Sequence, residues 1–103
     1  MLQLFKKLLG LGPAVDYKEL IANGAIIIDV RSKGEYLSGH IKNSINIPLD
    51  TLQSQLSKIK KDKPVITCCA SGMRSAAAKS ALKSAGFTEV YNGGGWSSLQ
   101  NKL

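Results

Sequence analysis

The chain has 103 residues, of which 44% are hydrophobic, so it can bury the core of one domain but is too short for two. Lysine and arginine outnumber aspartate and glutamate by 14 to 7, which favours anionic partners. The two cysteines are adjacent and cannot build a disulfide framework, which indicates a reducing, cytoplasmic setting. One histidine and two cysteines are too few for a structural zinc site, so no metal is expected.

The chain begins with a short apolar segment. Its hydrophobic residues, from Leu2 to Leu9, recur near helical spacing, which predicts a helical extension over residues 1–12 ahead of a single domain over residues 13–103. Two lysines interrupt the apolar run and no small-residue cleavage site follows, which is not typical of a secretory signal, and the segment is too short to cross a bilayer. We expect it to pack on the domain rather than dock on a membrane or a protein partner.

The next elements are predicted from capping signals and apolar runs. A capping-box-like start at Asp16 predicts a short helix that ends near Gly24. The continuous apolar run over residues 25–31 is typical of a strand buried on both faces of a parallel sheet. A helical turn is predicted over residues 33–38 and a short strand over residues 45–47.

The second half of the chain continues this alternation. Asp50 or Thr51 can cap a helix that runs towards Ile59. Val65 to Thr67 is predicted to be a buried central strand, and the alanine-rich stretch from Ser75 to Ala85 a helix that stops at Gly86. The last elements are predicted as a strand over residues 88–91, a flexible glycine turn over 92–95 and a helical tail over 96–103. The alternation predicts an α/β sandwich with a mainly parallel central sheet flanked by helices.

Four lysines cluster between residues 58 and 63, directly before the predicted central strand. No nucleic-acid motif surrounds them, and the aromatic residues are too few for a base-stacking platform, so no nucleic-acid partner is expected. The cluster is interpreted as a solvated helix end and turn. We expect its charge to help attract a small anion to the loop that follows the strand.

That loop begins with Cys68 and Cys69 and ends with Arg74. A loop between a strand end and a helix start points its backbone N–H groups and the positive end of the helix at its centre, and Arg74 adds a permanent charge. Together these effects are large enough to make a thiolate the main species at neutral pH. The alternative is that both cysteines are small core residues. Side chains alternate along a strand, so the two cysteines should face opposite ways.

The spacing to the arginine allows two interpretations. Counted from Cys68, the sequence formally fits the Cys-x5-Arg-Ser pattern of protein tyrosine phosphatases. Counted from Cys69, it resembles the Cys-x-x-Gly-x-Arg-Ser loop of the rhodanese family, and the position of Gly72 favours this second interpretation. Four further motifs resemble the same family in the same order: Asp29-Val-Arg31, Glu35-Tyr36, Gly39-His40-Ile41 and Asn46-Ile47-Pro48.

The resemblance to single-domain rhodaneses covers roughly residues 13–97 and implies a three-layer rhodanese-like sandwich and a sulfurtransferase. Cys69 would be the nucleophile that takes sulfane sulfur from a small anionic donor such as thiosulfate. It would hold that sulfur as a persulfide and pass it to a thiophilic acceptor, with no cofactor. The substrate-binding residues would be those of the loop: Ala70, Ser71, Gly72, Met73 and Arg74. Met73 stands where the family more often has a polar residue, which predicts a more apolar pocket mouth.

The matched motifs outside the loop are expected to support the site. Asp29 and Arg31 are predicted to form structural hydrogen bonds near it, and Glu35 to pair with Arg31 or His40. His40 is predicted to be a structural imidazole, because a preformed thiolate needs no general base. Two alternatives remain open at this stage: a phosphatase or arsenate reductase on the related fold that uses Cys68, and a non-enzymatic persulfide carrier or partner-binding module.

Overall fold

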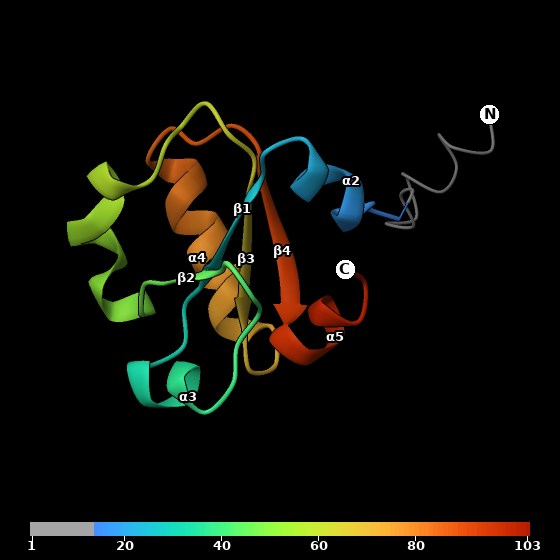
Figure 1. Cartoon of the computed structure of the whole chain (residues 1–103). Coiled ribbons are helices and arrows are strands. Elements are labelled where there is room, and N and C mark those ends of the chain that lie inside the picture. The colour runs from blue at the N-terminus through green and yellow to red at the C-terminus, as the bar shows by residue number, and fades with distance from the viewer. Residues whose placement is uncertain (1–13) are drawn as a thin grey trace.

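The computed structural model describes residues 14–103, so the helical extension expected over residues 1–12 lies outside the described residues. A four-stranded parallel sheet forms the middle layer, with the strand order β2-β1-β3-β4 (Figure 1). The strands are β1 (Ile26–Asp29), β2 (Ile45–Asn46), β3 (Val65–Cys69) and β4 (Val90–Gly95). β3 lies between β1 and β4, so the strand that leads into the cysteine loop is central, as predicted.

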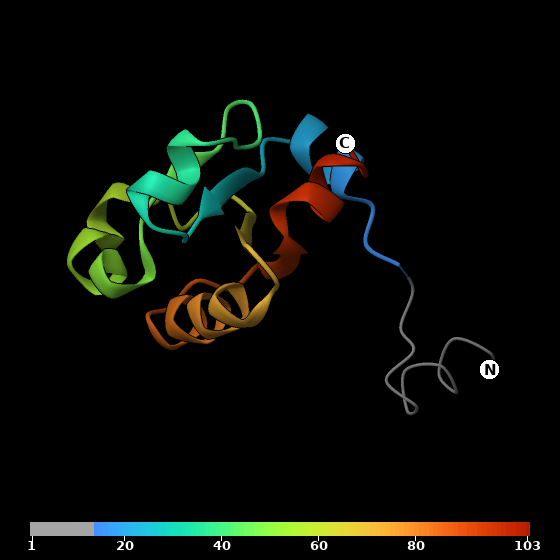
Figure 2. The ribbon, with the colours of Figure 1, turned by 90° about the horizontal axis from the view of Figure 1, so that it is seen from below.

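Helices cover both faces of this sheet. The 3-10 helix η1 (Leu49–Lys58) and helix α4 (Met73–Ser84) lie on one face, while α2 (Tyr17–Ala22) and α5 (Trp96–Gln100) lie on the other (Figure 2). The short helix α3 (Lys33–Leu37) follows β1. The predicted three-layer α/β sandwich is therefore confirmed. Over residues 14–103, no helix has both the length and the hydropathy that a membrane span requires.

The core consists of two layers of buried side chains, one on each face of the sheet. Towards α4 and η1 the strands contribute Ile28, Val65 and Cys69, whereas towards α2 and α5 they contribute Ile27, Ile66 and Cys68. Each fully buried isoleucine or leucine side chain contributes roughly 1.5–3 kcal/mol of transfer free energy. The two cysteines therefore face opposite layers, which confirms the alternation predicted for this strand.

The glycine segment differs from its prediction. Residues 92–95 were expected to form a flexible turn after a strand over 88–91, but β4 begins at Val90 and continues through Gly95. The reason is close packing of backbones: a Cβ atom on Gly93 would lie 2.8 Å from the carbonyl oxygen of Thr67, and one on Gly95 would lie 2.9 Å from that of Ala70. The missing side chains let β4 approach β3 and its loop, and glycine here serves packing rather than a turn.

Two helical predictions also need correction. The helix expected from Asp50 or Thr51 begins at Leu49 and has 3-10 rather than α geometry. Helix α4 begins at Met73, two residues earlier than expected, because Gly72 has φ of 108° and turns the chain directly into the first helical turn. β3 likewise runs to Cys69 instead of ending at Thr67. These shifts place the nucleophile candidate and the helix start closer together than the sequence suggested.

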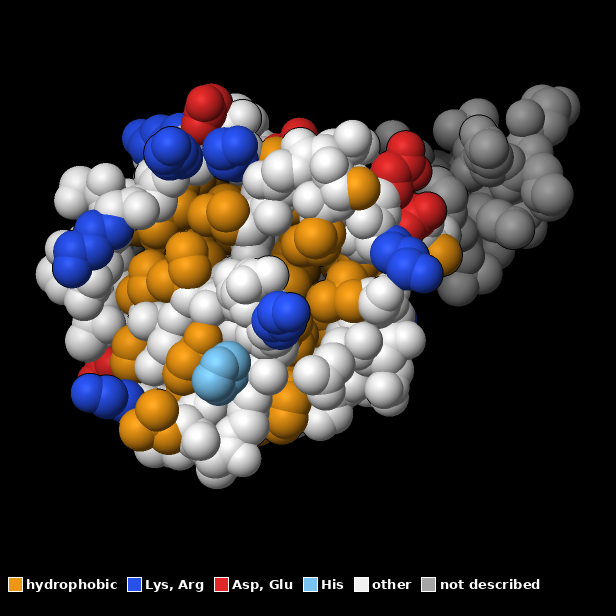
Figure 3. All heavy atoms as spheres, in the orientation of Figure 1, with side chains coloured by type: hydrophobic (Ala, Val, Ile, Leu, Met, Phe, Trp, Pro, Cys, Tyr) orange, Lys and Arg blue, Asp and Glu red, His pale blue; other side chains and the backbone are white. Residues whose placement is uncertain are grey.

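The lysine cluster lies far from the cysteine loop. Residues 58–63 connect η1 to the amino end of β3, whereas the loop follows the carboxyl end of the same strand. Figure 3 shows Lys and Arg side chains gathered at the top of the molecule, where Figure 1 places the start of β3. The lysine cluster and the loop therefore lie at opposite ends of β3, and the expectation that the cluster helps attract an anion to the loop stays a prediction.

The close packing of β4 gives a stability test. We expect Gly93→Ala to lower the free energy of unfolding by about 3 kcal/mol, because the new methyl group overlaps atoms of Thr67, Ile66 and Leu99 at 2.8–2.9 Å. Gly34→Ala is the matched control. It lies in α3 with nothing within 4 Å of the added Cβ, so it should raise stability by about 0.5–1 kcal/mol. Urea unfolding of both variants measures the difference; equal stabilities would contradict the packing role.

Candidate active site

Cys69 lies at the carboxyl end of β3, where ligands bind in open parallel sheets. Its Sγ accepts a hydrogen bond from the backbone N–H of Gly72 at 2.9 Å and lies 3.5 Å from the hydroxyl oxygen of Ser75. The residue is 1% exposed, so its sulfur lies at the floor of the loop beneath the exposed Ala70 and Ser71. This geometry brings the sulfur to the amino end of α4, where the helix dipole favours negative charge.

Two opposing effects act on the Cys69 thiol. Burial disfavours the thiolate, but hydrogen bonds from the hydroxyl and backbone of Ser75 and from the backbone of Gly72 and Ser71 outweigh it. Together they hold the pKa of Cys69 below its ordinary value. The loop therefore favours the reactive form of this cysteine.

Cys68 has the opposite environment. Its side chain is fully buried among Ile27, Ile66 and Leu99 on the other face of the sheet. Burial, assisted by the negative charge of Asp29, raises the pKa of Cys68 to about 12. A thiol with this pKa is protonated at neutral pH and is a poor nucleophile. Of the two adjacent cysteines, only Cys69 has the environment of a nucleophile.

Arg74 is held by a carboxylate from another element. Its Nη1 donates to Glu35 Oε1 at 2.7 Å and its Nη2 to Glu35 Oε2 at 2.9 Å, which is bidentate geometry. The guanidinium, followed by the backbone N–H of Ser32, lowers the pKa of Glu35 to about 2. The prediction that the Glu35 side chain pairs with Arg31 or His40 is therefore wrong. The long Arg74 side chain reaches from α4 to α3 and binds Glu35, which lies 39 positions away in the sequence.

Asp29 and Arg31 form a buried ion pair below the loop. Arg31 Nη2 donates to Asp29 Oδ2 at 2.7 Å and to the carbonyl oxygen of Gly39 at 2.7 Å. Its guanidinium carbon also lies 4.7 Å from the ring centroid of Trp96, in cation–π contact. These contacts tie the end of β1 to α5 and to the segment that follows α3, so both residues act within the scaffold.

The remaining predicted residues, His40 and Met73, lie near the surface. The ring of His40 is exposed, stacks on Tyr36 with centroids 3.8 Å apart, and its Nδ1 lies 2.8 Å from the Tyr36 carbonyl oxygen. Met73 is 81% exposed at the start of α4. His40 therefore supports the end of α3, and Met73 presents an apolar side chain beside Arg74.

Sequence reasoning missed two polar residues of the site, Ser75 and Asn92. The Ser75 hydroxyl lies 2.6 Å from Asn92 Oδ1, and the same Oδ1 accepts the N–H of Gly94 at 2.9 Å. Ser75 directly follows the arginine of the loop motif, so the motif itself carried a signal for it. Asn92 carried only an indirect signal, its position near the end of a strand parallel to β3, where the carboxyl ends of strands meet.

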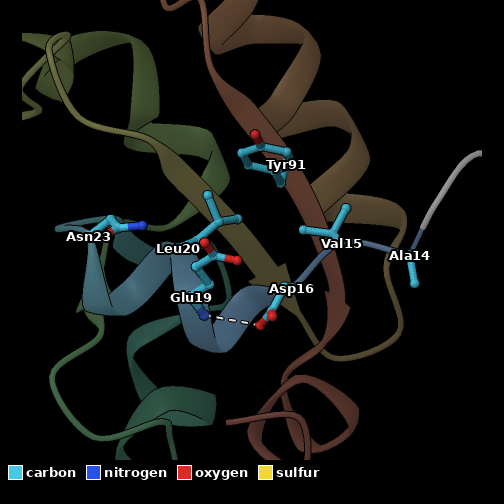
Figure 4. Close-up of a pocket in the computed structure, with 7 residues that line it drawn as sticks. All are labelled: Ala14, Val15, Asp16, Glu19, Leu20, Asn23 and Tyr91. Carbon is cyan, nitrogen blue, oxygen red and sulfur yellow. Dashed lines mark hydrogen bonds between the residues drawn. The ribbon is translucent and has the colours of Figure 1, made fainter.

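Two cavities lie near these elements. One of about 400 Å³ borders the loop and is lined by Val30, Ser32, Pro48, Leu49, Asp50 and Arg74. The other, of about 350 Å³, lies between α2 and β4 and contains no residue of the loop (Figure 4). Its walls include Leu20, Tyr91 and Asp16, whose carboxylate accepts the N–H of Glu19 and caps α2. Of these two cavities, the first includes a residue of the loop, Arg74.

Within residues 14–103, no three His, Cys, Asp or Glu side chains gather as a metal site would require.

The family comparison agrees with the loop motif: the model of the rhodanese-like domain matches residues 13–102. The chain therefore belongs to the rhodanese-like domain family. Membership of this family indicates a sulfurtransferase-type or related activity.

Two curated relatives are longer than this chain. It is 43% identical over 68 residues to the Bacillus subtilis protein YqhL, an alignment that covers 66% of this chain and 54% of that protein. It is 38% identical over 74 residues to the tRNA uridine(34) hydroxylase of an Enterobacter species, covering 66% of this chain and 21% of the hydroxylase. The chain thus spans about half the length of the first relative and a fifth of the second.

Solved structures are similar over most of the domain. A rhodanese from E. coli, solved with anions, superimposes with a TM-score of 0.69 at 32% identity and covers 73% of this chain and 91% of that chain. The human single-domain sulfurtransferase TSTD1 gives a TM-score of 0.72 at 28% identity and covers 89% of this chain and 98% of that chain. Both similarities extend well beyond the loop.

The contrast between the two cysteines can be tested by alkylation. At pH 7 iodoacetamide should modify Cys69 faster than Cys68, because hydrogen bonds lower the pKa of Cys69 whereas burial raises that of Cys68 to about 12. Ser75→Ala should move the midpoint of the rate–pH profile of Cys69 upward, because a hydrogen bond to the thiolate is lost. Ser98→Ala, on the exposed side of α5, is the control and should leave the midpoint unchanged. Peptide mass spectrometry distinguishes the sites; preferential labelling of Cys68 would contradict the assignment.

Proposed function

We propose that this protein is a sulfurtransferase that carries sulfane sulfur as a persulfide on Cys69. One observation supports this most strongly: the Cys69 Sγ lies at the amino end of α4 and accepts the Gly72 N–H at 2.9 Å. Hydrogen bonds of this kind stabilise a thiolate before reaction and the terminal anionic sulfur of a persulfide afterwards. Membership of the rhodanese-like domain family supports the same chemistry.

The proposed reaction has two half-reactions. With thiosulfate as donor, the Cys69 thiolate attacks the outer sulfur, the S–S bond of thiosulfate breaks, and sulfite leaves with the electron pair of that bond. The product is Cys69–S–S⁻. A thiophilic acceptor such as cyanide then attacks the terminal sulfur, forms thiocyanate and restores the Cys69 thiolate. This is covalent, ping-pong catalysis, and it needs no external cofactor or proton donor.

The narrow access to the sulfur also supports this class of donor. Cys69 is 1% exposed, so a reacting atom at the tip of a slender group reaches it more readily than the crowded phosphorus of a phosphate ester. The loop N–H groups still offer hydrogen bonds to anions. Weak binding of phosphate or sulfate is therefore compatible with the proposal, whereas turnover of phosphate esters is not.

The environment of Cys68 argues against the phosphatase or arsenate reductase alternative. That alternative needs Cys68 as nucleophile, but its thiol faces the opposite core layer and has a pKa of about 12. The remaining alternative is a persulfide carrier that delivers sulfur to a protein partner. The same Cys69 environment would serve both roles, and kinetics distinguish them.

Persulfide formation is the direct test. Incubation with thiosulfate should add one sulfur atom to the intact protein, and dithiothreitol should remove it. Cys69→Ser should abolish both the added mass and thiosulfate:cyanide sulfur transfer, because it removes the nucleophile. Cys68→Ser should retain activity and lose roughly 1–2 kcal/mol of stability, because it places a hydroxyl among apolar side chains. The reverse pattern would contradict the choice of cysteine.

Initial-rate kinetics then separate an enzyme from a carrier. An enzyme should give parallel double-reciprocal lines when thiosulfate and cyanide are varied, as ping-pong turnover requires. A persulfide that forms but discharges only to a protein would favour the carrier.

The phosphatase alternative has its own test. We expect negligible hydrolysis of p-nitrophenyl phosphate, because the loop from Cys69 to Arg74 has four intervening residues, one fewer than the phosphatase pattern counted from Cys68. The measurement is release of p-nitrophenol by the wild type and by Cys68→Ser. Robust hydrolysis that Cys68→Ser abolishes would overturn the proposed function.

A further inference from the structure

The charge of Arg74 is largely compensated at the loop. Both of its terminal nitrogens bind the carboxylate of Glu35 at 2.7 and 2.9 Å. Glu35 is itself fixed by a capping box: its Oε1 accepts the N–H of Ser32 at 3.0 Å, and the Ser32 hydroxyl accepts the N–H of Glu35 at 3.3 Å. The carboxylate is therefore held in place by α3, and an anionic substrate must compete with it for the guanidinium.

One carboxylate lies on the cavity itself. The cavity of about 400 Å³ that borders the loop is lined by Arg74 and by Asp50, which is exposed in the first turn of η1. Its other walls are the apolar Val30, Pro48 and Leu49 together with Ser32. Glu35 does not line the cavity, but its carboxylate binds Arg74, so Arg74, Glu35 and Asp50 together carry one formal negative charge. The cavity wall is mostly apolar, and these three side chains leave no uncompensated positive charge on it.

The positive charge of the chain does not reverse this local balance. The formal net charge is +7, but the lysines of residues 58–63 lie at the amino end of β3. β3 has five residues and is roughly 16 Å long, about twice the Debye length of about 8 Å at physiological ionic strength. The lysine charges are therefore largely screened at the loop, where Glu35 and Asp50 are near.

We propose that Glu35 and Asp50 are specificity residues that select against dianionic sulfur donors. The donor class that fits is a hydropersulfide, R–S–SH, whose R group is uncharged and apolar and occupies the cavity beside Arg74. This inference rests on the proposed function and names its donor. The Cys69 thiolate attacks the outer sulfur, the donor S–S bond breaks, R–S⁻ leaves with its electron pair, and Cys69–S–SH forms with the donor proton on the terminal sulfur. Thiosulfate, with two negative charges, reacts at the same atom but against the local repulsion.

The test compares two donors of different charge. The rate constant for Cys69 persulfide formation is measured by intact mass with thiosulfate and with benzyl hydropersulfide, for the wild type, Glu35→Gln, Asp50→Asn and the double variant. Each single change should raise the ratio of the thiosulfate to the benzyl hydropersulfide rate constant by about three- to tenfold, since one charge less repels the dianion. The gain should shrink as salt is added. Gln at position 35 can still complete the capping box with Ser32, so the fold is kept.

Asp62→Asn is the matched control. It removes the same charge from an exposed residue at the opposite edge of the sheet, so the ratio should stay as in the wild type. An unchanged ratio in Glu35→Gln and Asp50→Asn, with persulfide forming from both donors, would overturn the selectivity and leave the sulfurtransferase intact. An equal rise in Asp62→Asn would also overturn it, because net charge alone would then explain the effect. Failure of both donors to load the folded wild type would overturn both proposals.

Discussion

The hydrogen bond from the Gly72 N–H to the Cys69 sulfur is the interaction on which the site depends. It forms because Gly72 takes φ of 108°, a conformation that a side chain would strain, and because the loop between the two residues is short. The carbonyl of Gly72 is bound in turn by the N–H of Ala76 and lies 3.0 Å from the Ser75 hydroxyl. One glycine thus connects the sulfur, the loop and the first turn of α4.

The glycines of β4 hold this arrangement from the other side. A side chain on Gly95 would collide with the carbonyl of Ala70, and a Cβ on Gly72 would already lie 3.6 Å from the Cα of Gly94. Asn92 adds the hydrogen-bonding side chain that orients Ser75 beside the thiol. The loop is therefore preorganised by backbone contact rather than by large side chains, which leaves its outer surface to small residues and Met73.

The two arginines near the site show how differently an ion pair can act. Arg31 and Asp29 are buried, and the contacts of Arg31 with Gly39 and Trp96 satisfy its remaining surface, so loss of either partner would leave an uncompensated charge. Arg74 and Glu35 each keep about 38% of their side chains exposed, so their pair adds little to stability. Its importance is electrostatic, since it sets the charge that a substrate meets at the loop.

The sequence by itself determined the class of fold and the location of the loop. Alternation of apolar runs with helical stretches predicts the sandwich, since burial on both faces of β1 and β3 requires helices on both sides. The motif from Cys69 to Ser75 is local, so its cysteine, glycine and arginine could be matched to the rhodanese loop from the sequence. The opposite orientation of Cys68 and Cys69 also followed from strand geometry.

Only the tertiary structure decided which distant residues meet. Glu35 and Arg74 are 39 positions apart, and no local pattern indicates that they pair rather than Glu35 with Arg31. The extended glycines of β4 look like a turn in sequence, because glycine permits both a turn and close backbone contact, and the neighbouring strand selects between them. The lysine cluster and the loop are close in the sequence, with only β3 between them. In space, β3 separates them by its full length. Charge, register and close approach depend on distances in space, which sequence separation does not fix.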